Sequence, residues 1–397
     1  MTSDLERVQY GKSLNALGIP RDKDPFPFDA PHVVDYWADN KKVLQKIIQA
    51  QIDSIMFASS FIYVFYGPLG GGKTFAAAYL ANPKTQKLIL ENVPKPISES
   101  LIIRVPAVAP LRTGQLTFSL HKDIVKKCFS AILKSEELMK IFAKTKQLGS
   151  GKIKAAFKDI RKSVMPSLEG KLRVADLTNL EGYKFLTQTR SRLGKLTDVN
   201  ELVETIRILV SILSGKYGRI IISIDELENL ARATGTERVI CSDFLRKMHE
   251  MIEHDLTLFL IFTFESYEEV SRTLQPALLS RVRESVEFTF VQTKSDVKEY
   301  IRECLLLRSK VDPKEVVSAE VIDAIADSLI TNFRGRLSFR DINREMHRIF
   351  TTTYILVNQP SKYKIDLKLY EKARKGTSAE EIVKRITEKM SQTGGQK

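Results

Sequence analysis

The residues with the clearest chemical purpose lie at 67–74, where Gly-Pro-Leu-Gly-Gly-Gly-Lys-Thr has the spacing of a P-loop. The six residues before it, 61–66, are apolar and rich in β-branched and aromatic types, which predicts a buried strand. An apolar helix start, 75–80, follows at once. A strand, a glycine loop and a helix in this order predict a site for phosphate groups, rather than a glycine-rich turn without a ligand.

Each part of this loop has a role in such a site. Glycines let backbone N–H groups turn toward phosphate oxygens, and the helix N-terminus adds partial positive charge. Lys73 can reach the outer phosphates, and the Thr74 hydroxyl can ligate Mg²⁺. We therefore expect ATP with Mg²⁺ to be held by the loop and the first helical turn, that is, by Gly67, Pro68, Gly70, Gly71, Gly72, Lys73, Thr74 and Phe75.

A second strong signal is the apolar run 219–224, which ends in the carboxylates Asp225 and Glu226. Such a run fits a central strand of a parallel sheet, and ligands bind at the carboxyl ends of strands in open α/β sheets. We expect Asp225 to hold Mg²⁺ and Glu226 to act as the general base on the attacking water. Glu228 is interpreted as a charge at a helix N-terminus.

A further buried strand is predicted over 256–263 and ends at Thr263. A small hydroxyl side chain at this end of the sheet can meet the outermost phosphate or the attacking water. The alternative is that Thr263 only caps the following turn.

Positive charge is concentrated in two segments of a chain of 397 residues with net charge +14. Residues 121–195 hold 18 Lys and Arg against 7 Asp and Glu, a net charge of +11, and residues 361–397 carry +5, which leaves −2 for the rest. This pattern favours nucleic acid as the partner of the insert 121–195, contacted through backbone phosphates because aromatic residues are sparse there. The alternative is a solvated, lysine-rich helical face.

Composition excludes several other classes of protein. The three cysteines, Cys128, Cys241 and Cys304, are far apart, so neither a disulfide framework nor a zinc site is expected. No signal peptide opens the chain, and the longest apolar run, near 55–66, is too short to span a bilayer. We expect a protein of the cytoplasm, without a membrane segment.

The pattern along the chain predicts an α/β domain followed by helices alone. We expect an extended lead-in at 1–30, an α/β domain at 31–293 with a basic helical insert at about 118–195, a small helical domain at 294–352 and a basic helical tail at 353–397. Within the α/β domain, 32–57 is predicted helical, and 101–105 and 286–290 are predicted strands. Phe26 and Phe28 in the lead-in are candidates for the wall of an adenine pocket, with core packing as the alternative.

The order of these parts resembles the AAA+ ATPases, over roughly residues 25–350. The motifs that carry the likeness are the P-loop 67–74, the Walker B strand 221–226, Thr263 at the sensor-1 position and Leu-Leu-Ser-Arg at 278–281. Within the superfamily, the chain looks most like the origin-recognition initiators and the ATPases that regulate transposition. The resemblance implies a three-layer parallel-sheet P-loop domain followed by a small all-helical lid.

The resemblance also implies residue roles. Arg281 matches the arginine finger that one subunit inserts into its neighbour's ATP site, with Arg283 as an alternative. Arg340 matches the sensor-2 arginine of the lid, with Arg336 as an alternative. Two features depart from the pattern: too few residues follow 350 for a winged-helix domain, and no asparagine stands near the end of the strand 101–105.

Together these signals lead to three functional hypotheses. The first is an ATP hydrolase that forms a homo-oligomer, a ring or a filament, and acts as a switch on DNA. The second is a protein-remodelling, signalling or defence ATPase whose basic insert binds an acidic protein partner. The third is a nucleotide-binding scaffold without hydrolysis, against which the intact set of predicted catalytic residues argues: Lys73, Thr74, Asp225, Glu226 and Arg281.

Overall fold

A computed structural model describes most of the chain and divides it into two compact units. The described residues are 4–27, 34, 36–38, 40–57, 59–93, 98–107, 115–145, 149, 153–154, 157–158, 198–358 and 360–375. One unit comprises Lys41–Phe288, and the other comprises Met1–Asn40 together with Thr289–Lys397. Phe28, most of the basic insert and the tail beyond 375 lie outside the described residues.

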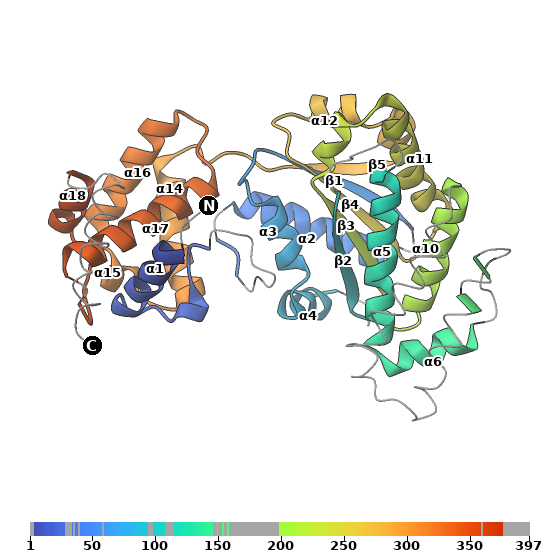
Figure 1. The fold of residues 1–397 in the computed structure, drawn as a ribbon, viewed down its shortest axis with the longest axis horizontal. Coiled ribbons are helices and arrows are strands. Elements are labelled where there is room, and N and C mark those ends of the chain that lie inside the picture. Colours follow the sequence, from blue (N-terminus) through green and yellow to red (C-terminus); the bar gives the residue numbers. More distant parts are fainter. Residues whose placement is uncertain are drawn as a thin grey trace, which may run out of the picture. The chain divides into compact units, whose positions relative to one another are not determined.

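The unit of Lys41–Phe288 is built on a five-stranded sheet in the order β2-β3-β4-β1-β5 (Figure 1). All four neighbouring pairs are parallel. The central strands consist of apolar residues because both faces of the sheet are covered. The strands are β1 (Phe61–Tyr66), β2 (Ser100–Pro106), β3 (Arg219–Asp225), β4 (Leu256–Phe262) and β5 (Val282–Glu287).

Helices cover both faces, which gives three layers. Figure 1 shows α5 (Gln115–Leu133), α10 (Val199–Leu213) and α11 (Gly235–Met251) on one side of the sheet, where they share one large apolar core with β1 to β4. The helices α2 (Lys41–Met56), α3 (Lys73–Leu80) and α4 (Pro83–Glu91) form the other layer. Shorter elements are α6 (Glu136–Lys144), η3 (Leu227–Arg232), α12 (Tyr267–Thr273) and α13 (Pro276–Leu279).

The predicted strand 286–290 was misplaced, because β5 begins at Val282 and ends at Glu287. This strand lies at the edge of the sheet and pairs only with β1 among the strands. An edge strand is exposed on one side and can therefore be rich in polar residues. β5 is such a strand, so its sequence has no apolar run that would mark where it begins and ends. Its backbone continues to Phe288, whose N–H donates to the Tyr66 carbonyl at 2.7 Å.

The second unit consists of helices from both ends of the chain. The predicted extended lead-in is wrong over Asp4–Ala16, which forms the helix α1 and packs on α17 (Phe339–Leu356). The ring of Tyr10 stacks on His347, and Asn343 donates to the Pro27 carbonyl at 2.9 Å. The remaining elements are η1 (Arg21–Lys23), α14 (Lys294–Glu303), the π-helical turn η4 (Cys304–Ser309), α15 (Pro313–Val316), α16 (Ala319–Phe333) and α18 (Leu367–Lys375).

No helix in the described ranges is long and apolar enough to cross a membrane.

Candidate functional site

The loop after β1 is shaped by glycines that no other residue could replace without strain. Gly67 has φ +150°, and a Cβ atom there would lie 2.0 Å from the Phe288 carbonyl oxygen. Gly72 has φ +96° and caps the N-terminus of α3 in the left-handed conformation. The backbone therefore folds tightly between β1 and α3 and against Phe288, and we call this loop, residues 67–72, the cradle.

Lys73 is held inside this cradle by its own loop. Its ammonium Nζ donates to the carbonyl oxygens of Gly67 and Pro68, each at 2.8 Å. The side chain is only 5% exposed. A buried positive charge at the N-terminus of a helix suits an anionic ligand.

The two predicted Mg²⁺ ligands lie in contact although they are 151 residues apart in the chain. The Thr74 hydroxyl donates to Oδ2 of Asp225 at 2.6 Å. Thr74 is in the first turn of α3, and Asp225 is the last residue of β3. Parallel strands bring their carboxyl ends to one edge of the sheet, so the loop after β1 and the end of β3 meet there.

Glu226 follows in a left-handed backbone conformation, with φ +61°. Its N–H donates to Oδ1 of Asp225 at 2.9 Å, and its side chain is exposed. Partial burial raises the pKa of Glu226 above its ordinary value, and the negative charges of Asp225 and Glu228 raise it further. A carboxylate with a raised pKa beside the predicted cation site is suited to accept a proton from water.

Glu228 connects this turn to the end of β4. Its Oε2 accepts a hydrogen bond from the Thr263 backbone N–H at 3.0 Å. Glu228 does lie in the first turn of the 3₁₀ helix η3, as the sequence predicts, but its contact with Thr263 was not foreseen. The sequence did contain a hint of this contact, because Glu228 stands two residues after Glu226 and so lies close to the end of the neighbouring strand β4.

Arg104 is the other residue at this edge that sequence reasoning missed. Its Nη2 donates to the Thr74 carbonyl at 3.5 Å, from the strand next to β3. Burial lowers the pKa of Arg104, and the charge of Asp225 opposes that change. A guanidinium therefore stands beside Asp225, near the strand end where the resemblance would have an asparagine.

Comparison with solved structures bears on this arrangement. The Aeropyrum pernix ORC2 protein, solved as ADPNP and ADP complexes, matches with a TM-score of 0.50 and 11% identity, over 89% of this chain and 71% of that one. The Aeropyrum pernix ORC1 protein in complex with DNA has a TM-score of 0.49 and 15% identity, over 88% and 68%. No protein-family model and no curated protein sequence matches the chain.

The chain has the AAA+ fold. The likeness to ORC2, the strand order and the P-loop context agree on this point. The expected α/β fold with a parallel sheet, followed by helices, is confirmed. We refer below to residues 41–288 as the AAA+ unit and to the rest as the helical unit.

In the AAA+ unit, Arg281 and Arg283 lie near the amino ends of the strands, whereas the P-loop lies at their carboxyl ends. Val282 pairs with Ile62 at the start of β1, whereas the P-loop follows the end of β1. From Ile62 to Tyr66, the last residue of β1, there are four steps of about 3.3 Å, so about 13 Å of strand lies between the two ends. Neither arginine is therefore among the groups around Lys73 and Asp225.

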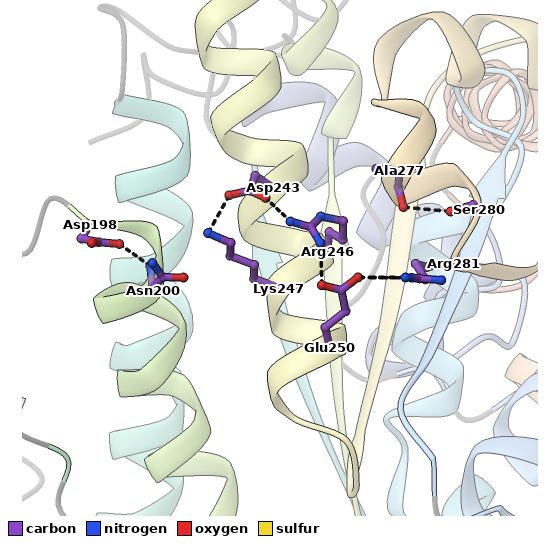
Figure 2. A network of polar contacts seen from close by, with 9 residues as sticks. All are labelled: Asp198, Asn200, Asp243, Arg246, Lys247, Glu250, Ala277, Ser280 and Arg281. Atoms are coloured by element: carbon purple, nitrogen blue, oxygen red, sulfur yellow. Dashed lines mark hydrogen bonds and ion pairs between the residues drawn. The ribbon is translucent and has the colours of Figure 1, made fainter.

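The two arginines have different partners. Arg283 lies over the rings of Phe57 and Phe61, with its guanidinium carbon 5.6 Å and 4.9 Å from their centroids, and is 3.7 Å from Asp53. Arg281 instead donates to Oε1 of Glu250, from Nε at 3.3 Å and from Nη2 at 3.2 Å (Figure 2). Glu250 lies on α11.

The helical unit contains Arg340, Arg336 and Phe26. Arg340 is half-buried in the first turn of α17, and Arg336 is exposed in the turn before it. Phe26 is fully buried and meets the ring of Phe350 at 5.9 Å, edge to face. Phe26 thus packs in the core of the helical unit, which is the alternative that the sequence left open.

Most of the described residues of the basic insert belong to α5 and α6. These helices are amphipathic, and their buried sides include Phe129 and Phe142. Lysines on these helices face solvent, and among them Lys140 pairs with Glu136 at 2.5 Å. The exposed lysines are Lys126 and Lys127 on α5, Lys134 in the turn between the helices, and Lys140 and Lys144 on α6.

Proposed function

We propose that this chain hydrolyses ATP and acts as an oligomeric switch that associates with nucleic acid. The observation that carries the hydrolase assignment is the 2.6 Å contact of Thr74 with Asp225, next to the buried Lys73 and the exposed Glu226. In this proposal, the phosphate site, the cation site and the general base are grouped where the loop after β1 meets the carboxyl end of β3.

The residues fit a nucleotide with Mg²⁺. The Lys73 ammonium lies within the cradle, and Thr74 with Asp225 offers the hydroxyl and carboxylate oxygens that hard cations prefer. When bound, Mg²⁺ would neutralise charge on the phosphate oxygens. Lys73 would move its donors from the loop carbonyls to phosphate, and Pro68 and Phe75 would line the loop and helix start. Glu226 would take a proton from the attacking water, and Thr263 would orient that water.

The position of Arg281 supports the proposed oligomer. About 13 Å of strand separates this arginine from its own P-loop, so we propose that it serves the ATP site of a neighbouring subunit. A guanidinium supplied in this way stabilises charge on the transferred phosphoryl group. We assign the finger to Arg281 because it ends the Leu-Leu-Ser-Arg motif at 278–281, and we keep Arg283 as the alternative. We propose Arg340 as the sensor-2 arginine, with Arg336 as the alternative.

The nucleic-acid role rests on charge. The segment 121–195 carries +11, and lysines on α5 and α6 face solvent. The ORC1 protein that the fold resembles was solved in complex with DNA. Lysine contacts to phosphates bind without reading sequence and weaken steeply as salt increases.

The experiment that tests this proposal measures ATP hydrolysis with and without duplex DNA, at low and high salt, beside a Glu226→Gln variant. We expect DNA to stimulate hydrolysis at low salt only, and the variant to bind ATP but not hydrolyse it. Hydrolysis that is independent of DNA in all conditions would favour an acidic protein partner instead. Equal hydrolysis by the variant would contradict the assignment of Glu226.

A further inference from the structure

The predicted finger arginine is held by a chain of ion pairs on a single helix (Figure 2). Glu250 accepts from Arg281 through Oε1 and from Arg246 through Oε2, the latter at 2.5 Å. Arg246 also donates to Asp243 at 2.6 Å, and Asp243 meets Lys247 at 3.1 Å. The four residues of α11 thus support one another on one face, and Glu250 is the member that reaches out of the helix.

The contact with Glu250 orients the guanidinium of Arg281 but leaves some of its N–H donors available for another acceptor. A guanidinium has five N–H donors, and Glu250 engages one on Nε and one on Nη2. Both bonds lie on the same edge of the planar group, so the plane is fixed while Nη1 points elsewhere. The Arg281 side chain is 50% exposed, against 30% for Glu250. The carboxylate is thus mostly covered and the arginine is presented outward.

The charges in the chain agree with this arrangement. Burial alone would raise the pKa of Glu250, but hydrogen bonds from Arg246 and Arg281 outweigh it and hold the pKa below its ordinary value. Glu250 is therefore ionised at neutral pH, and two arginines share its charge. Because Arg246 keeps one carboxylate oxygen in place, the other oxygen faces Arg281 in a fixed position.

We propose that Glu250, fixed by Arg246, is the positioning residue of the arginine finger: it orders Arg281 in the subunit that donates the finger, before a neighbour's nucleotide is reached. This inference rests on the proposed function, since it needs Arg281 to act in a second subunit. Preorganised donors avoid the cost of ordering at the moment of reaction, and small errors in placement are expensive in rate.

The test separates the donor subunit from the acceptor subunit. An Arg281→Ala subunit keeps its ATP site but lacks the finger, and a Glu226→Gln subunit keeps the finger but cannot hydrolyse ATP. We expect each to be nearly inactive alone and a mixture of the two to recover hydrolysis. Glu250→Gln is then added to the donor or to the acceptor, with Glu253→Gln, at an exposed position after the same helix, as the matched control.

In the donor, Glu250→Gln should lower the recovered kcat about 10-fold, while ATP affinity and KM stay unchanged. In the acceptor, the same substitution should leave the recovered rate unchanged, as should Glu253→Gln in either subunit. The glutamine is isosteric, and its ATP affinity shows whether the subunit is folded.

Three results would overturn the inference, and they are distinguishable. If the mixture of Arg281→Ala and Glu226→Gln subunits shows no recovery, Arg281 does not act in a second subunit, and neither the proposed finger nor its positioning by Glu250 stands. Full recovery with Glu250→Gln in the donor would leave the finger but remove the role of Glu250. An equal loss in donor and acceptor would mean that Glu250 serves the stability of α11 and not the position of Arg281.

Discussion

The two edges of the sheet are held in different ways. At the carboxyl edge, the position of Lys73 and the shape of the loop depend on backbone: glycine conformations and carbonyl acceptors. At the opposite edge, Arg281 and Arg283 depend on side-chain ion pairs and aromatic rings that are partly exposed to solvent. Backbone geometry tolerates few substitutions, whereas exposed ion pairs are individually weak. Single substitutions at the carboxyl edge should therefore cause a large loss of activity, whereas those at the opposite edge should cause losses of varying size.

The largest effect is expected for Gly67→Ala. The new Cβ would lie 2.0 Å from the Phe288 carbonyl oxygen, so the loop must move and the cradle is lost. We expect hydrolysis to fall by more than about 10²-fold, together with ATP affinity. Gly235→Ala is the matched control, because a Cβ at this first residue of α11 meets nothing within 4 Å. Measurable ATP binding by Gly67→Ala at wild-type affinity would contradict the proposed cradle.

The next effect concerns the opposite edge and compares its two arginines. Arg281→Ala should lower kcat by about 10²-fold with ATP affinity retained, since a finger acts on the transition state. Arg283→Ala should keep most of the activity and instead lower the free energy of unfolding by about 1 kcal/mol, because it loses the rings of Phe57 and Phe61 and the ion pair with Asp53. Steady-state kinetics and thermal unfolding distinguish the two, and the reverse pattern would make Arg283 the finger.

A smaller effect is expected at Glu228, which accepts from the Thr263 N–H. A charge-assisted hydrogen bond is stronger than a neutral one, so Glu228→Gln should loosen the end of β4 and lower kcat about 5-fold. Glu268→Gln, which removes an exposed ion pair with Arg272 on α12, is the control and should have near wild-type activity. Equal rates for the two variants would show that the contact with Thr263 has no catalytic role.

The smallest effect is a shift in pH dependence. Because the pKa of Glu226 is raised, kcat/KM should decline on the acid side at a higher pH than an ordinary glutamate would give. Part of that rise comes from the negative charge of Glu228, so Glu228→Gln should lower the pKa of Glu226 and move the acid limb to lower pH. A profile of kcat/KM against pH for both proteins checks the sign. A limb that moves to higher pH would mean that another group titrates.

The carboxyl edge could be predicted from sequence because its signals are local. An apolar run followed by glycines, or by two carboxylates, predicts both a strand and the functional groups at its end. Lys73, Thr74, Asp225 and Glu226 were predicted in this way. Glu250 and Arg104 gave no such signal. Their roles depend on which helix or strand lies beside which in the folded sheet, and spacing along the chain does not contain that information.

The prediction of an extended lead-in was wrong for a related reason. Pro25 and Pro27 indicated an extended segment, and the helix α1 before them carries no clear apolar face in its sequence. Its helix is stabilised by partners near the other end of the chain, such as the Tyr10–His347 stack, which no local pattern reports.

The joining of both chain ends in the helical unit has a consequence for synthesis. His347 bonds to the Phe26 carbonyl across 321 residues, so the lead-in cannot complete its packing until α17 has left the ribosome. At about 5–20 residues per second, that is a delay of roughly 15–60 s. The AAA+ unit, contiguous from 41 to 288, is complete earlier. During that interval Tyr10 and Phe26, buried in the finished fold, lack their ring partners on α17, so a chaperone would act on this nascent segment.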